Sequence, residues 1–150
     1  MNKILVAIDG SDHAWKALDL AAELAKAHGA RLLVLHVVPY EPVSEALRAF
    51  AAAENIPLEE ARGRFHEART LGDRLTRRAE AIARDKGVEA VESRAAEGSP
   101  ADEILAMAKA EGVDMIVLGT RGLSRPKALF LGSVSHKVVN QAECTCVTVK

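Results

Sequence analysis

The amino-acid sequence predicts an α/β fold in which a parallel β-sheet carries helices on both faces. Short apolar runs of strand length alternate five times with longer segments of helical spacing, an order typical of such folds. The run Arg31–Val38 is apolar almost throughout, as expected for a strand covered on both sides. The 150 residues contain no internal repeat, linker or low-complexity segment. We therefore expect a single domain over residues 1–150.

The first third of the chain predicts a strand, a helix and a second strand. An apolar run predicts a strand over residues 3–9, which leads into a turn at Asp9-Gly10-Ser11. A helix is predicted over residues 12–28, because alanine and leucine recur there with helical spacing. Gly29 marks the end of that helix. The apolar run over residues 31–38 then forms the second strand.

The middle of the chain predicts two helices and a third strand. A short alanine-rich helix is expected over residues 43–54, and a longer helix, dense in arginine and glutamate, over residues 58–86. Gly63 and Gly72 weaken the longer helix by roughly 1 kcal/mol each, and Gly63 is an alternative position for its start. A more polar strand is expected over residues 88–95.

Three helix-start signals agree after the third strand. Ser99 is a predicted N-cap, Pro100 suits the first helical position, and acidic residues follow in the first turn. Gly112 ends this helix. The remaining predicted elements are a buried strand over residues 115–118, a helix over residues 131–141 and a strand over residues 144–149.

The composition indicates a soluble globular protein that does not attract polyanions. Hydrophobic residues make up 49% of the chain, charged residues 27%, and the net charge is −1, so neither nucleic acid nor an acidic membrane is expected as a main partner. The longest apolar run, Leu32–Val38, is interrupted by His36 and is too short to span a bilayer. We expect a cytoplasmic protein without membrane insertion. Cys144 and Cys146 match no zinc-binding pattern and are expected to be core residues.

A glycine-rich segment near the C-terminal end predicts a phosphate-binding site. Gly119 and Gly122 follow the fourth strand, and Gly132-Ser133 come after a further nine residues, at the start of a helix. Glycine lets backbone N–H groups approach a ligand where a Cβ would collide. A helix N-terminus presents free N–H donors and a partial positive charge to an anion. The alternative is that the first two glycines only close a turn.

Other strand ends converge on the same region. Asp9, Val37, Gly98 and Gly119 lie at or just past the carboxyl ends of predicted strands, where open α/β sheets bind ligands. The sequence contains neither a dinucleotide fingerprint nor a P-loop pattern. Binding would therefore depend on backbone donors and on the last helix. The alternative role for Asp9 is to cap the first helix together with Ser11.

The spacing Gly119-x2-Gly122-x9-Gly132-Ser133 resembles the ATP-binding signature of the universal stress protein family. The opening segment Ile4–Ser11 is similar to the first strand and turn of that family, and the resemblance spans nearly the whole chain, least clearly over residues 40–74. It implies a Rossmann-like domain with an open five-stranded sheet of order 3-2-1-4-5. Thr145 stands where the family usually has proline, which bears on the entry to the last strand.

The resemblance also implies a ligand and its binding residues. The expected cofactor is ATP with Mg²⁺ or Mn²⁺ on its phosphates. Asp9 is expected to accept a hydrogen bond from a ribose hydroxyl or the adenine amine, and Ala7, Ile8 and Val37 to line the adenine. The other expected binding residues are Gly119, Thr120, Arg121, Gly122, Gly132, Ser133, Val134 and Ser135.

Charged and titratable residues near the site carry less information. Arg121, Arg125 and Lys127 concentrate positive charge that suits a triphosphate, although basic loops are common without a ligand. His36 and His136 are candidates for a general base, and we interpret both as structural. No Ser-His-Asp or paired-carboxylate arrangement is evident, so no catalytic residue is assigned.

Three functions are compatible with the sequence. The favoured one is an ATP-binding stress-response module that reports nucleotide state to an unidentified protein partner and is compatible with slow hydrolysis. The alternatives are a nucleotide-independent interaction protein and an ATP-consuming enzyme, such as an adenylyl transferase or a pyrophosphatase. In the sheet order given above, Cys144–Val149 is an edge strand. We expect it to form a homodimer by pairing with a second copy.

Overall fold

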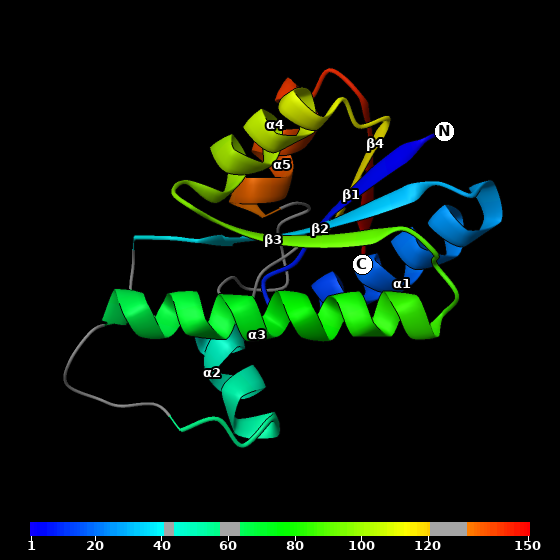
Figure 1. Ribbon diagram of the computed structural model, residues 1–150. Coiled ribbons are helices and arrows are strands. Elements are labelled where there is room, and N and C mark those ends of the chain that lie inside the picture. The colour runs from blue at the N-terminus through cyan, green and yellow to red at the C-terminus, as the bar shows by residue number, and fades with distance from the viewer. Residues whose placement is uncertain (41–43, 58–63, 121–131) are drawn as a thin grey trace.

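The computed structural model describes residues 1–40, 44–57, 64–120 and 132–150 (Figure 1). Strands and helices alternate along the chain, as predicted, with two helices between the second and third strands. The elements are β1 (Lys3–Ala7), α1 (Asp12–His28), β2 (Arg31–Val38), α2 (Glu45–Ala53), α3 (Arg64–Asp85), β3 (Val91–Glu97), α4 (Pro100–Glu111), β4 (Met115–Gly119), α5 (Ser133–Gln141) and β5 (Thr145–Val149).

The five strands form one parallel sheet in the order β3-β2-β1-β4-β5, which confirms the expected order. Val6 on β1 is in register with Val34 on β2 and with Val117 on β4. From β1, the chain adds β2 and then β3 on one side of the sheet, and β4 and then β5 on the other side. The order therefore reverses between β1 and β4, which is where ligands bind in open sheets of this type.

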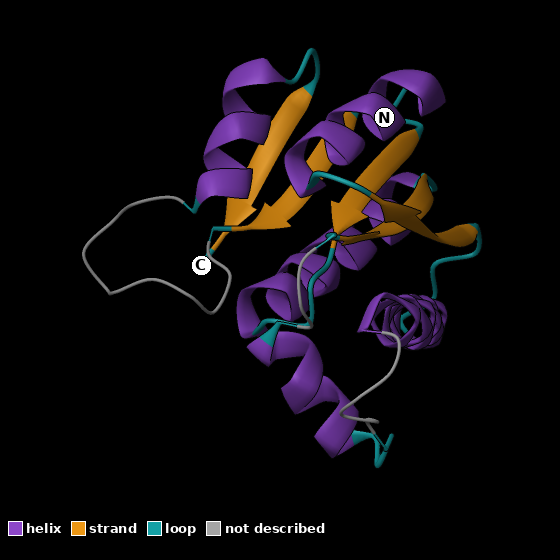
Figure 2. Ribbon diagram, turned by 90° about the vertical axis from the view of Figure 1, so that its left-hand side faces the viewer, coloured by secondary structure: helices purple, strands orange, loops and turns teal. Residues whose placement is uncertain are grey.

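Helices cover both faces of the sheet (Figures 1 and 2). In Figure 1, α4 and α5 lie above the sheet, whereas α1 and α3 lie below it. Neighbouring residues on β2 confirm the two layers, because Val34 is buried in the cluster with α1 and α3, while Leu35 is buried in the cluster with α4. Successive side chains on a strand point to opposite faces, so an all-apolar strand requires two cores.

Several element boundaries differ from the sequence prediction. The third strand begins at Val91 rather than at residue 88. Gly87 has a φ of +92° and Val88 N–H donates to Ala83 O, so this segment closes the end of α3 and Val88 packs in the core. The last strand begins at Thr145 rather than at residue 144.

The helix starts also differ in detail. The short helix begins at Glu45, where the Ser44 hydroxyl caps it by accepting a hydrogen bond from Leu47 N–H. Ser99 precedes α4 but makes no capping bond to its backbone. Lys137, which lies 2.7 Å from Asp102, and to a lesser extent the Ser99 side chain lower the pKa of the Asp102 carboxyl group. The predicted helix residues 58–63 and 131 lie outside the described residues.

Two further expectations concern membranes and cysteines. In the described part of the chain, no helix is long and apolar enough to cross a bilayer. Cys144 and Cys146 are free thiols that pack at the margin of the core beneath α4 and α5. Burial raises the pKa of both thiols, so they are poor nucleophiles.

Gly72 in α3 has a packing function that its sequence context did not reveal. A Cβ at this position would lie 2.7 Å from Cδ2 of His36 on β2. The His36 ring cannot easily move away, because it is only 2% exposed and its Nδ1 lies 2.8 Å from the Ile8 carbonyl oxygen. The glycine therefore lets α3 approach the sheet over the imidazole.

The Gly72→Ala substitution is expected to lower the free energy of unfolding by about 1–2 kcal/mol. The steric conflict with His36 outweighs the gain in helix propensity, which is about 1 kcal/mol. Urea denaturation followed by circular dichroism measures the change. The neighbouring exposed residue provides a control, since Asp73→Ala should be close to neutral. A Gly72→Ala variant more stable than the parent would contradict this account of the packing.

Candidate functional site

The predicted phosphate site lies at the carboxyl ends of β1 and β4, beside the start of α5. Gly132 N–H donates to the Thr120 carbonyl oxygen at 2.7 Å. This bond joins the residue after β4 to the residue before α5, so the two ends of the segment between them lie side by side (Figure 2). Arg121 and Gly122, and also Arg125 and Lys127, lie outside the described residues.

Thr120 forms a junction between four elements. Its N–H donates to Val149 O on β5, and its carbonyl oxygen accepts from Gly132 N–H and from the Ser135 hydroxyl. Its own hydroxyl lies 3.0 Å from Nδ1 of His13 on α1. The side chain is only 2% exposed, and each of its polar groups has a partner. We call Thr120 with these four residues the Thr120 junction.

The start of α5 is arranged to accept an anion. Gly132 is the N-cap residue and has no side chain that could occupy the first-turn N–H groups. The N–H groups of Ser133 and Val134 have no partner within the helix, and the Ser133 side chain is exposed. The helix dipole adds partial positive charge at this end. The geometry thus offers two backbone donors and one hydroxyl to a phosphate group.

Ser135 is less available to a ligand than its neighbours. Its hydroxyl lies 3.0 Å from Thr120 O and 3.1 Å from Gly132 O, and the residue is buried. A hydroxyl has one proton, so these two carbonyl groups occupy the donor capacity of the side chain. Ser135 therefore holds the first turn of α5 against β4.

The structure gives a reason for Gly119 that is independent of any ligand. A Cβ at Gly119 would lie 2.8 Å from Cβ of His13 and 3.1 Å from the backbone nitrogen of Ala14. Real Cβ atoms do not pack this closely against backbone atoms. The glycine at the end of β4 is thus required by the approach of the first turn of α1.

Asp9 lies at the end of β1 and takes part in the turn before α1. Its Oδ1 accepts a hydrogen bond from Ser11 N–H at 2.9 Å, and Ser11 Oγ accepts from Ala14 N–H. Ser11 is therefore the capping residue, and Asp9 supports it from outside the helix. Among the described residues, Oδ2 of Asp9 has no hydrogen-bond partner, and the side chain is half-buried. This oxygen remains available to accept a hydrogen bond from a ligand.

The residues predicted to line adenine are divided between the two faces of the sheet. Ala7 and Val37 pack on the side of α4 and α5, whereas Ile8 is buried on the side of α1. The backbone of Ile8 is also engaged, since its N–H donates to Leu35 O and its carbonyl oxygen contacts His36. Ala7 and Val37 consequently offer more to a ligand than Ile8 does.

His36 lies beneath the site and His136 lies on its surface. His36 contacts Ile8 O through Nδ1, and its buried Nε2 has no hydrogen-bond partner in the part of the chain that the structure describes. Burial lowers the pKa of His36, opposed by the Ile8 carbonyl and the carboxylates of Asp9 and Asp73. His136 is exposed on α5, where its side chain contacts Asn140. The positions of both histidines agree with structural roles.

Sequence reasoning missed His13 and the packing role of Gly72. His13 connects α1 to the Thr120 hydroxyl across 107 positions of the chain, and no local pattern marks such a pair. Gly72 looked like a weak point in a helix, because its partner His36 is on a different element. Both functions depend on tertiary contacts.

Comparison with known proteins assigns the chain and its fold to one family. The model of the universal stress protein family matches residues 1–150. The chain belongs to the universal stress protein family. It is 43% identical over 150 residues to "Universal stress protein YxiE" of Bacillus subtilis, and the match covers 99% of each chain.

Solved structures of universal stress proteins share the fold. UspA of Lactobacillus plantarum superposes with a TM-score of 0.79 at 24% identity, over 99% of this chain and 97% of that one. A universal stress protein in complex with cAMP superposes with a TM-score of 0.72 at 26% identity, with the same coverage. The α/β architecture with its parallel sheet is therefore that of the family.

The stability of this universal stress protein is expected to fall below pH 6.5, the ordinary pKa of histidine. Because the pKa of His36 is lowered in the folded state, the unfolded chain binds more protons below that pH. The contribution of neutral His36 to the free energy of unfolding is fully present above pH 6.5. It declines by up to about 1.4 kcal/mol per pH unit as the pH falls from 6.5 towards the pKa of His36 in the folded state. Urea denaturation between about pH 7.5 and pH 5.5 measures this slope.

Two variants distinguish the contribution of His36 to this pH slope from that of other titrating groups. His36→Gln should reduce the slope, whereas His136→Gln, on the exposed surface of α5, should leave it as in the parent. An unchanged slope in His36→Gln would exclude His36 as its origin.

Proposed function

We propose that this universal stress protein binds ATP at the switch point of its sheet and reports nucleotide state to a protein partner in the cytoplasm. The main observation behind the proposal is the start of α5, where among the described residues no side chain caps the N–H groups of Ser133 and Val134. The structure of a universal stress protein in complex with cAMP, at 26% identity, supports an adenine nucleotide as the ligand.

Each part of the nucleotide has a matching group at the site. The phosphates interact with the N–H groups at the start of α5 and with the Ser133 hydroxyl. Oδ2 of Asp9 accepts a hydrogen bond from a ribose hydroxyl, while Oδ1 remains bonded to Ser11 N–H. Ala7 and Val37 provide apolar contacts to the adenine from the same face of the sheet.

The expected Mg²⁺ or Mn²⁺ fits this site only as a companion of the phosphates. Within the ranges that the structure describes, no three His, Cys, Asp or Glu side chains are grouped so that they could hold a metal ion. The ion would therefore take most of its ligands from phosphate oxygens and water, which is usual for Mg²⁺ bound with nucleotides.

The Gly132→Val substitution is expected to weaken ATP binding about ten- to hundredfold. Its side chain lies where the phosphate approaches α5, and the lost charge-assisted hydrogen bonds contribute about 1.5–3 kcal/mol. Gly132 has φ −68° and ψ 164°, which valine adopts readily, so the backbone tolerates the change. Isothermal titration calorimetry measures the affinity, and circular dichroism checks the fold. Unchanged affinity in a folded variant would place the phosphates elsewhere.

Native mass spectrometry of the purified protein distinguishes the proposed ATP binding from the two alternative functions. Bound ATP supports the proposal, whereas AMP together with pyrophosphate indicates an enzyme that cleaves ATP. A protein that carries no nucleotide and fails to bind added ATP is a nucleotide-independent interaction module.

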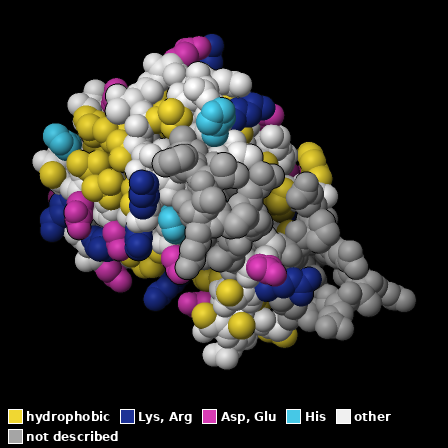
Figure 3. Space-filling view, turned by 180° about the vertical axis from the view of Figure 1, so that it is seen from behind, with side chains coloured by type: hydrophobic (Ala, Val, Ile, Leu, Met, Phe, Trp, Pro, Cys, Tyr) yellow, Lys and Arg dark blue, Asp and Glu magenta, His cyan; other side chains and the backbone are white. Residues whose placement is uncertain are grey.

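We further propose that β5 pairs with its copy in a second molecule to form a homodimer. β5 lies at the edge of the sheet, and its residues are half-buried except the first. Figure 3 shows hydrophobic side chains gathered on the left of the molecule, the side that carries β5 and α1. The half-buried apolar residues of these two elements are Trp15, Leu20, Leu24, Val147 and Val149.

Backbone geometry identifies which β5 residues face the free edge. Val149 O accepts from Thr120 N–H beyond β4, and backbone groups alternate in direction along a strand. Residues 145, 147 and 149 therefore point their N–H and C=O groups towards β4, whereas Cys146 and Thr148 point theirs outward. An antiparallel partner strand would bond to these two residues.

Thr148→Pro is expected to convert the homodimer into a monomer, because proline removes an outward N–H donor without breaking the ladder to β4. Thr148→Val keeps this donor and should remain dimeric. Sedimentation velocity at micromolar concentration measures the mass. A parent protein that sediments with the mass of one chain would end the dimer hypothesis, and a dimeric Thr148→Pro variant would place the interface elsewhere.

A further inference from the structure

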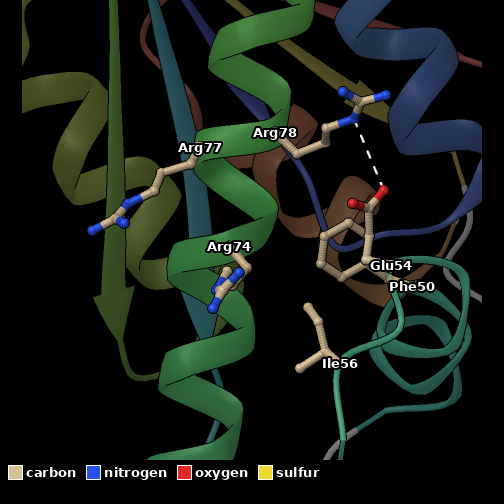
Figure 4. A pocket seen from close by; sticks show the side chains of 6 residues that line it. All are labelled: Phe50, Glu54, Ile56, Arg74, Arg77 and Arg78. Carbon is tan, nitrogen blue, oxygen red and sulfur yellow. Dashed lines mark ion pairs between the residues drawn. The ribbon is translucent and has the colours of Figure 1, made fainter.

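A cavity of about 350 Å³ lies between α2 and α3, away from the carboxyl ends of the strands. Its wall on the side of α2 contains Phe50, Glu54 and Ile56, and α3 contributes three arginines to the opposite side (Figure 4). The volume lies within the range of pockets that bind small organic molecules. Neither the cavity nor its residues have a role in the nucleotide site.

The cavity carries an excess of positive charge. Arg74, Arg77 and Arg78 line it together with a single carboxylate, that of Glu54. Only Arg78 pairs with this carboxylate, at 4.0 Å, and both side chains are about half exposed. Among the described residues, Arg74 and Arg77 have no carboxylate within ion-pair distance. Two guanidinium groups are therefore left without a counter-charge from the described protein.

The spacing of these arginines follows from the helix. Positions 74, 77 and 78 are separated by three and four residues, so they lie on neighbouring turns of α3, beside the stripe that contains the buried Leu71 and Leu75. Like charges on neighbouring turns repel each other. An anion placed among them would relieve this repulsion.

The floor of the cavity is apolar. Phe50 is only 8% exposed and Ile56 is half-buried. The Phe50 ring packs against Trp15 of α1, with ring centroids 6.4 Å apart. Guanidinium groups bind anions and also the face of an aromatic ring. Beside Phe50 they therefore favour a ligand that is anionic at one end and aromatic at the other.

We propose that the cavity between α2 and α3 is a second ligand site, which binds a small organic anion with an apolar or aromatic body. The head group, a carboxylate or phosphate, contacts Arg74 and Arg78, and the body packs on Phe50 and Ile56. In Figure 4, the Arg77 guanidinium extends away from Phe50 and Ile56. Arg77 therefore contributes long-range charge but little direct contact.

Phenyl phosphate is a suitable probe, and NMR of the isotope-labelled full chain detects its binding. Trp15 is the single tryptophan and contacts Phe50, so its indole N–H signal reports occupation of the cavity. We expect saturable shifts with a dissociation constant on the order of 1 mM. Benzyl alcohol, which lacks the charge, and inorganic phosphate, which lacks the ring, should each bind at least about fivefold more weakly.

Matched variants distinguish contact from general charge. Arg74→Ala should weaken phenyl phosphate binding about fivefold, whereas Arg77→Ala, which removes the same charge from the same helix, should change it less than about twofold. Glu54→Gln removes the competing carboxylate and should tighten binding. Each substituted residue lies on the surface, and circular dichroism checks the fold of each variant.

Several results would overturn the proposal. These are the absence of saturable Trp15 shifts, equal losses in Arg74→Ala and Arg77→Ala, or weaker binding in Glu54→Gln. Binding that Gly132→Val weakens and Arg74→Ala leaves unchanged would show that the probe occupies the strand-end site instead. Because ATP binding itself is measured separately, a failure of the nucleotide proposal leaves this test intact.

Discussion

The arrangement of the strand-end site depends on the hydrogen bonds of one buried residue, Thr120. Its N–H, carbonyl and hydroxyl groups connect β4 to β5, α5 and α1. A buried polar group without a partner costs about 1–3 kcal/mol, so each of these contacts is strongly favoured once the residue is enclosed. The start of α5 is thereby fixed to the sheet, and its open N–H groups have a defined position. A phosphate site needs such preorganised donors, because donors that must first be ordered bind more weakly.

The same constraint separates the residues that build the strand-end site from those that present N–H groups to the proposed ligand. Gly119 belongs to the family signature and Ser135 was an expected binding residue, yet the approach of α1 requires the first and the Thr120 carbonyl engages the second. Residues that build the donor arrangement are thus distinct from those that present donors to a phosphate. Ser133 and Val134 supply the donors, and the surrounding residues hold them in place.

The fold was predictable from local pattern to a large extent, and the site only in outline. The strand at Arg31–Val38 and the helix at 12–28 match the structure because their signals are local: an apolar run, and helical spacing that ends at a glycine. The start of β3 was misplaced, because Val88 is apolar yet closes the end of α3. Contacts that join distant segments, such as His13 with Thr120, leave no local signal.

The charge distribution shows why bulk composition says little about ligands. The chain carries a net charge of −1, which excludes general attraction to polyanions. The structure nevertheless concentrates positive potential at two separate places, the N-terminus of α5 and the cavity with Arg74, Arg77 and Arg78. The first potential comes from backbone N–H groups and is invisible in a count of charged residues. The second arises from the spacing of side chains on one helix.

Helix α2 borders the cavity and approaches the turn between β1 and α1. Phe50 of α2 and its C-cap residue Glu54 line the cavity, while near the start of the helix a Cβ on Gly10 would lie 3.3 Å from the Ala46 carbonyl oxygen. Gly10 belongs to the turn in which Asp9 supports Ser11. A nine-residue helix moves largely as one body, since its backbone hydrogen bonds link successive turns. Helix α2 therefore borders both the cavity and the turn that holds Asp9.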